Sequence, residues 1–112
     1  IEYPTHRSLL ISGTASINKD GETVFLDDVV SQIDLTMRVA KALLQSRKMD
    51  WRNLFRGRVY LKHPDYLKYF KEYCRKYKIS GSNLAVAFTD MCRDSLLFEI
   101  ELDAFISKAS VP

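Results

Sequence analysis

The stretch Leu96-Leu97-Phe98-Glu99-Ile100-Glu101-Leu102-Asp103-Ala104-Phe105-Ile106 alternates in character with a period of two. Successive side chains of a β-strand point to opposite faces of its sheet, so this pattern predicts a strand over residues 96–106. The even positions are all apolar, whereas the odd positions carry Leu97, Glu99, Glu101, Asp103 and Phe105. A strand with one wholly apolar face has to bury that face against a second layer.

Two amphipathic helices are expected to form that layer. Asp27 and Asp28 can cap a helix N-terminus, and the apolar residues that follow recur every three or four positions. This pattern predicts a helix over 28–46, whose stripe consists of Val29, Val30, Ile33, Met37, Ala40, Leu43 and Leu44. A second helix is predicted to start at His63-Pro64-Asp65, since proline is favoured in a first turn, and to end near 79–81. Its stripe consists of Leu67, Phe70, Cys74 and Tyr77.

The remaining apolar segments predict the other strands. They lie at 9–17, 22–25, 55–61 and 84–89, and the first two flank a hairpin turn at Asn18-Lys19-Asp20-Gly21. The predicted order is β-β-α-β-α-β-β. We therefore expect an α+β fold in which a single mixed sheet carries both helices on one face. No repeat or linker interrupts the chain, so residues 1–112 are expected to form a single domain.

The sheet face without helices is expected to be an interface. It would carry Arg58, Tyr60 and Lys62 from the middle strand, together with the acidic residues of 96–106. Such a mixed face can stay wet or pack against copies of itself. Leu97 and Phe105 would gain from burial, which favours a symmetric homo-oligomer.

Composition excludes several classes of site. The 17 basic residues exceed the 14 acidic ones and give a net charge of +3. They are scattered along the sequence, so nucleic acid is not an expected partner. Two cysteines, Cys74 and Cys92, and two histidines form no cluster with metal-ligand spacing, so neither a metal nor another cofactor is expected.

The cysteines and the chain start also bear on location. Two free thiols fit a reducing cytoplasm, and no apolar run approaches the ~20 residues of a membrane span. Ile1 is not an initiator methionine, so we expect the chain either to be a fragment of a longer protein or to have lost residues at its start.

Glu99 is the strongest candidate for chemistry. Placed in a cleft among apolar side chains, its carboxyl should have a raised pKa, which suits a general acid near neutral pH. Cys92 and Arg93 could line the same cleft. The alternatives are a solvated acid, a small buried thiol and an ordinary polar turn.

Two further groups could bind an anionic ligand. Arg58, Tyr60 and Lys62 project from one strand face, with the guanidinium as a fork and the ammonium as a point charge. Their alternative is pairing with acids at a subunit interface. Ser12 and Gly13 could offer backbone N–H groups, although Gly13 could simply mark a strand bulge.

Four motifs, in order, resemble the YjgF/RidA family. They are Ile11-Ser12-Gly13-Thr14-Ala15, Asp28-Val29-x-x-Gln32, Val59-Tyr60-Leu61 and Phe98-Glu99-Ile100-Glu101, and the resemblance runs from about Leu9 to Ile106. It implies a trimer of chorismate-mutase-like subunits with three clefts between neighbours, and a small carboxylate-bearing ligand.

Two branches of the family carry different expectations. The imine- and enamine-hydrolysing branch has an arginine that holds the substrate carboxylate, but Leu84 stands at that place, fifteen residues before Glu99. The segments 12–17 and 92–101 are more similar to the C-terminal half of chorismatases, also known as pteridine-dependent dioxygenase-like proteins. That likeness implies a catalytic acid at Glu99 and product-determining positions at Cys92 and Ala15.

Three functions follow as hypotheses. The first is a metal-free hydrolase of chorismatase or imine-deaminase type. The second is a non-catalytic trimeric binding or interaction module. The third is an RNA-binding or endoribonuclease-type protein, against which the weak basic character argues.

Overall fold

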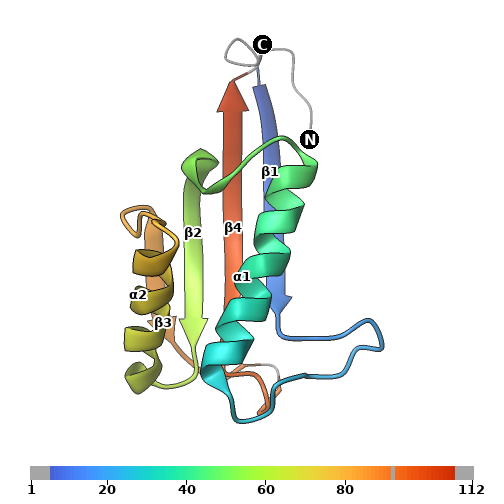
Figure 1. The fold of residues 1–112 in the computed structure, drawn as a ribbon, viewed down its shortest axis with the longest axis vertical. Helices are drawn as coiled ribbons and strands as arrows, with labels where there is room; N and C mark the ends of the chain where they lie inside the picture. The colour runs from blue at the N-terminus through green and yellow to red at the C-terminus, as the bar shows by residue number, and fades with distance from the viewer. Residues whose placement is uncertain (1–5, 92, 108–112) are drawn as a thin grey trace.

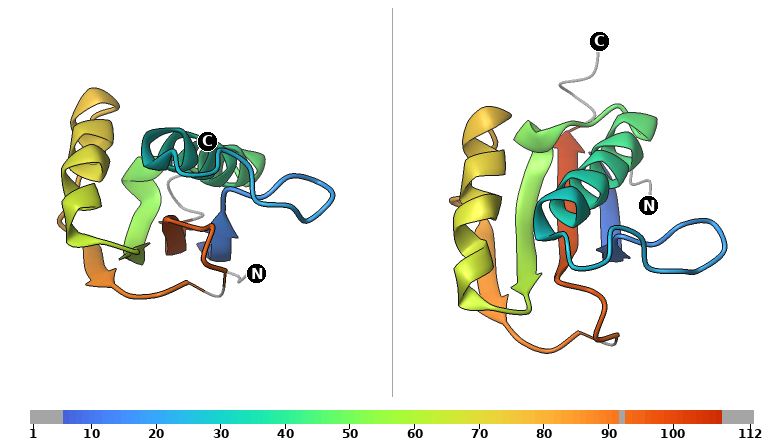
Figure 2. Two further views of the ribbon diagram at one scale, coloured as in Figure 1. Left: turned by 90° about the horizontal axis from the view of Figure 1, so that it is seen from below. Right: turned by 60° about the horizontal axis from the view of Figure 1, so that its bottom comes forward.

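A computed structural model describes residues 6–91 and 93–107. The elements follow in the order β1 (His6–Ala15), α1 (Val29–Ser46), β2 (Leu54–Leu61), α2 (Leu67–Lys76), β3 (Leu84–Phe88) and β4 (Phe98–Ser107), with short 3₁₀ turns at Trp51–Asn53 and Pro64–Tyr66 (Figure 1). Both helices lie on the same face of the sheet, as the end-on view shows (Figure 2). The predicted α+β fold, with a mixed sheet and two helices on one face, is confirmed.

The sheet has the strand order β1-β4-β2-β3. The central strand β4 runs antiparallel to both of its neighbours, whereas β2 and β3 are parallel. The return strand expected at 22–25 is reduced to a single bridge between Ile17 and Thr23. Phe25 and Asp27 adopt positive φ angles of 59° and 56°, which turns the chain away before a ladder can extend.

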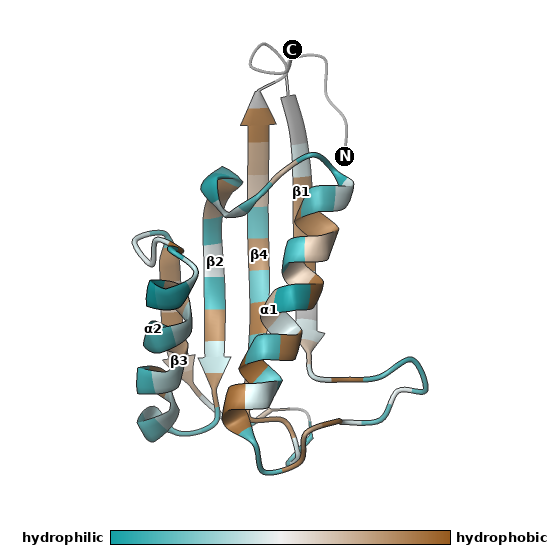
Figure 3. Cartoon of the chain, viewed as in Figure 1, coloured by the Kyte–Doolittle hydropathy of each residue, from teal (hydrophilic) through white to brown (hydrophobic). Residues whose placement is uncertain are grey.

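Alternation along β4 builds the core (Figure 3). Phe98, Ile100, Leu102 and Ala104 are buried against the helices, and the matching positions of β2 are Val59 and Leu61. Helix α1 begins at the cap Asp28, whose carboxylate accepts from the Ser31 amide at 3.0 Å. Its buried face contains Val29, Ile33, Met37, Ala40 and Leu44.

Some expected core positions differ. Val30 and Leu43 of α1 are exposed, as is Tyr77 beyond the end of α2, because the sheet covers only a narrow stripe of each helix. Leu97 was expected on the open face beside Glu99, but β4 starts at Phe98, two residues later than predicted, and Leu97 is buried in the core.

Cys74 is a buried core residue of α2, and burial raises the pKa of its thiol to about 11. No helix in the described part of the chain is long and apolar enough to cross a membrane.

Candidate functional site

The site is assembled by three strands that place their polar residues on the open face of the sheet. Glu99 of β4 lies between Ala15 of β1 and Tyr60 of β2, and Glu101 pairs with Arg58. These residues come from chain segments that lie far apart in the sequence, with Tyr60 and Glu99 separated by 39 positions, and only the strand register brings them together.

Glu99 is half-buried, and its pKa is raised above the ordinary value. The main cause is desolvation, which disfavours the charged form, and the second is repulsion by Glu101 on the same face. A carboxyl in this state retains its proton to higher pH than an exposed glutamate, as a general acid requires.

Arg58 lies beside this pair of acids with an exposed side chain. A hydrogen bond with the Tyr60 hydroxyl raises the pKa of its guanidinium, and the nearby Glu101 carboxylate adds to the effect. The Arg58 N–H donors therefore lie in one row with the Tyr60 hydroxyl and the two carboxyls on the open face of the sheet.

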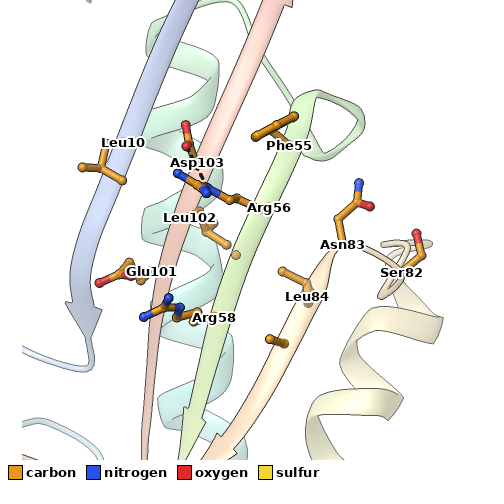
Figure 4. A pocket seen from close by; sticks show the side chains of 12 residues that line it. Leu10, Phe55, Arg56, Arg58, Ser82, Asn83, Leu84, Glu101, Leu102 and Asp103 are labelled. Atoms are coloured by element: carbon orange, nitrogen blue, oxygen red, sulfur yellow. Dashed lines mark hydrogen bonds and ion pairs between the residues drawn. The ribbon is translucent and has the colours of Figure 1, made fainter.

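An open depression of about 610 Å³ lies next to this row on the same face of the sheet (Figure 4). It shares Arg58 and Glu101 with the row just described, but Glu99 is not among its lining residues. Within it, the Arg56 guanidinium and the Asp103 carboxylate form an ion pair with Nε and Oδ2 3.3 Å apart. The exposed side chains of Leu10 and Phe55 border the pair.

Sequence reasoning missed Arg56, Phe55 and Leu10 as members of this surface. Arg56 could have been found, because it has the same strand parity as Arg58. Leu10 could not, because only the pairing of β1 with β4 places it beside Asp103.

Two of the cationic side chains that were expected to bind a ligand, those of Lys62 and Arg93, are already hydrogen-bonded within the chain. The Lys62 ammonium donates to the Asp94 carbonyl and lies 3.8 Å from the Asp94 carboxylate. The Arg93 guanidinium donates to the Gly21 carbonyl at 2.6 Å. A ligand would have to compete with these bonds, so Arg58 is the more accessible cation.

The structure places the other candidate residues as follows. The pairing of β1 with β4 shifts register between Ile11 and Thr14, which fits the predicted bulge at Gly13. Ser12 is exposed at this irregularity, and Ala15 is buried next to Glu99. Cys92 lies outside the described residues. Within residues 6–91 and 93–107, no group of three or more His, Cys, Asp or Glu side chains is arranged to hold a metal ion.

No protein-family model matches the sequence, and no curated protein sequence matches it significantly. Solved structures do resemble it. YyfB of Yersinia pestis, a Rid-family protein of unknown function, is 24% identical with a TM-score of 0.74, over 94% of this chain and 83% of that one. TdcF of E. coli with bound serine is 15% identical with a TM-score of 0.74, over 96% and 85%.

A chorismatase is also similar, with 24% identity and a TM-score of 0.74. That match covers 87% of this chain but only 32% of the chorismatase. Identities at this level establish a shared fold.

Proposed function

With the fold of the YjgF/Rid proteins as the premise, we propose that this chain forms a trimer that binds a small carboxylate-bearing metabolite between subunits. We further propose that it hydrolyses this metabolite with Glu99 as the acid. The observation that carries the proposal is the half-buried Glu99, whose pKa is raised in the row between Ala15 and Tyr60.

The chemistry follows from a carboxyl that holds its proton. Protonated Glu99 donates its proton to an imine nitrogen or to an enol-ether carbon. The carbon bonded to the protonated atom then carries the positive charge. Water attacks that carbon, and the Glu99 carboxylate accepts the proton that the water releases. Glu99, which then holds the proton again, donates it to the departing nitrogen or ether oxygen as that bond breaks, and its carboxylate takes the proton of the new hydroxyl. The products are a carbonyl compound and ammonia or an alcohol. Arg58 is the candidate partner for the ligand carboxylate.

Self-association is supported by apolar side chains on the open face. Leu10 and Phe55 are 68% and 63% exposed in the single chain, and Phe105 is also exposed. A neighbouring copy that covers this face would bury these side chains and close the open side of the depression, which lies next to Glu99. The serine bound to TdcF supports a small ligand that carries a carboxylate.

A non-catalytic binding module is the second candidate. Leu84 is the observation in its favour, since its apolar side chain packs against the core at the place where imine hydrolases have an arginine. Such a module would bind the ligand through Arg58 but would not turn it over.

Turnover of chorismate and of 2-iminobutyrate separates these candidates. Purified protein should release pyruvate from chorismate or ammonia from 2-iminobutyrate. Glu99→Gln should lower either rate by about 10²–10⁴-fold, the usual contribution of a general acid. Glu72→Gln provides the control, because Glu72 pairs with Arg75 on the exposed side of α2.

Each outcome decides between the two candidates. Turnover that survives Glu99→Gln excludes Glu99 as the acid. Absence of turnover by the unmodified protein, combined with calorimetric binding of serine or 2-oxobutanoate that Arg58→Met weakens, supports the binding module instead.

A further inference from the structure

A buried glutamine ties together the two segments that flank Glu99. Gln32, in the first turns of α1, is fully buried. Its Nε2 donates to the Phe25 carbonyl at 3.1 Å and to the Ser95 carbonyl at 3.0 Å, while its Oε1 accepts from the Leu97 amide at 2.9 Å. All three partners are backbone groups of loops, so this amide does more than stabilise its own helix.

On the side of β4, the bridge ends two residues before Glu99. The Leu97 amide bonds to Gln32, and the Leu97 carbonyl accepts from the Lys62 amide at 3.1 Å. Both backbone groups of Leu97 are therefore fixed. Phe98 follows in the core, paired with Leu61, and the next residue is Glu99.

On the side of β1, the bridge reaches the segment that follows Ala15, the other neighbour of Glu99. Ser16 is fully buried and forms two hydrogen bonds with Val24. The Ser16 hydroxyl donates to the Val24 carbonyl at 2.8 Å, and the Val24 amide donates to the Ser16 carbonyl at 3.0 Å. Phe25 then presents its carbonyl to Gln32.

Direct bonds also join the two flanking segments. The Ser95 hydroxyl bonds to the Thr23 hydroxyl at 2.8 Å, and Arg93 donates to the Gly21 carbonyl. The backbone on the 16–27 side is strained, because Phe25 and Asp27 have positive φ angles. Such conformations persist only where surrounding contacts enforce them, and Gln32 bonds directly to one of the two residues.

We infer that Gln32 is a positioning residue for Glu99, acting by locking the segments before Phe98 and after Ala15 into one arrangement. This inference rests on the proposed function only in assigning Glu99 a chemical role. The bridge fixes the backbone that leads into Glu99 and the backbone that follows its neighbour Ala15.

The test uses Gln32→Met, which preserves the side-chain length but makes none of the three bonds. Hydrogen exchange should accelerate at the Leu97 amide by about tenfold or more relative to the Ala104 amide inside β4, because local opening replaces a protected state. A carbon-13 titration of the Glu99 carboxyl should show its midpoint move down towards the ordinary value as water enters. Glu101, Arg58 and Tyr60 face this carboxyl, and the pairing of β2 with β4 that places them should persist in the variant.

Thr36→Val is the matched control. Thr36 lies one turn further along α1 and is equally buried, and its hydroxyl lacks a hydrogen-bond partner among the described residues. Removing that hydroxyl should leave both the Leu97 exchange and the Glu99 midpoint unchanged.

Gln32→Glu covers the case in which the methionine variant does not fold. A neutral carboxyl keeps the acceptor for the Leu97 amide and one donor for the two carbonyls, so Leu97 exchange relative to Ala104 should be intermediate.

Faster Leu97 exchange with an unchanged Glu99 midpoint would reduce Gln32 to a purely structural role and overturn the inference. An equal response in Thr36→Val would do the same. Because neither readout needs turnover, a failed turnover assay counts against the proposed function and leaves the positioning test intact.

Discussion

At Glu99, two modest effects act in the same direction. The carboxyl is half-buried between neighbouring strands, and Glu101 follows it by two residues on the same face, about 7 Å along the strand. Neither effect requires a deep cavity. The pKa of Glu99 can therefore rise in the single chain, and closure by a second copy would remove more water and raise it further.

The raised pKa sets the direction of a stability change in Glu99→Gln. The folded chain holds the Glu99 proton more tightly than the unfolded chain, whose carboxyl keeps the ordinary value of 4.5. The resulting stabilisation is complete below that value and is lost as the pH rises through the folded pKa. Glutamine does not titrate, so the variant should be more stable than the parent at pH 7, with the difference shrinking at pH 4.

Urea denaturation at the two pH values measures this difference. Asp20→Asn, in the exposed turn after Asn18, serves as the control for loss of one negative charge. A glutamine variant that is less stable than the parent at pH 7 would mean that the Glu99 carboxylate has a favourable partner that outweighs its desolvation.

At the scale of single elements, β2 depends on a glycine. A Cβ at Gly57 would lie 2.7 Å from the methyl groups of both Leu102 and Leu84, and 3.1 Å from the Glu101 carbonyl oxygen. The two leucines thus occupy the space that a side chain would need, and this contact seats β3 against β2. The parallel pairing holds the Leu84 backbone beside Gly57, so a Cβ there could be accommodated only by rotation of the two leucine side chains.

Gly57→Ala should accordingly destabilise the fold by about 1–3 kcal/mol, the usual cost of overpacking a core. Gly81→Ala is the matched control, since a Cβ there would meet no atom within 4 Å, and its effect should stay within about 0.5 kcal/mol. Chemical denaturation of both variants provides the measurement. Equal stabilities would show that the leucines can repack at no cost.

Local periodicity explains which elements the sequence could predict. The long alternation of β4 and the stripe of α1 each repeat several times, so their bounds are correct to within two residues. The segment 22–25 is too short to show a period, and its fate depends on backbone angles at Phe25 and Asp27 that its composition does not determine. Leu43 continues the helical stripe but extends past the width of the sheet.

The candidate site was only partly predictable for a similar reason. Strand parity places Glu99, Glu101, Arg58 and Tyr60 on one face, but only the register between strands shows which of them are neighbours. Gln32 lies within the predicted helix 28–46, but two of its hydrogen-bond partners lie 63 and 65 residues away along the chain. Contacts at that separation leave no local pattern in the sequence.

At the scale of the whole molecule, the helices cover one face of the sheet and leave the other open (Figure 2). Leu10, Phe55 and Phe105 lie exposed on that open face, around the Arg56–Asp103 pair. The edge strand β3 adds Ala85 and Ala87, which pair with Arg58 and Tyr60 and are also exposed. A monomer would leave all of these groups in water, so assembly through this surface should bury substantial apolar area.

Leu10→Glu tests this assembly directly. Leu10 is 68% exposed, so the glutamate should hardly affect folding of the single chain, but in a trimer it would bring a charge into a buried contact close to Asp103. Sedimentation velocity should show the parent as a trimer and the variant shifted towards monomer. Val39→Glu introduces the same charge at an exposed apolar position of α1, on the opposite layer, and should remain assembled. A trimer that tolerates Leu10→Glu but dissociates with Val39→Glu would place the interface on the helical face, and the depression beside Glu99 would then lie open to solvent.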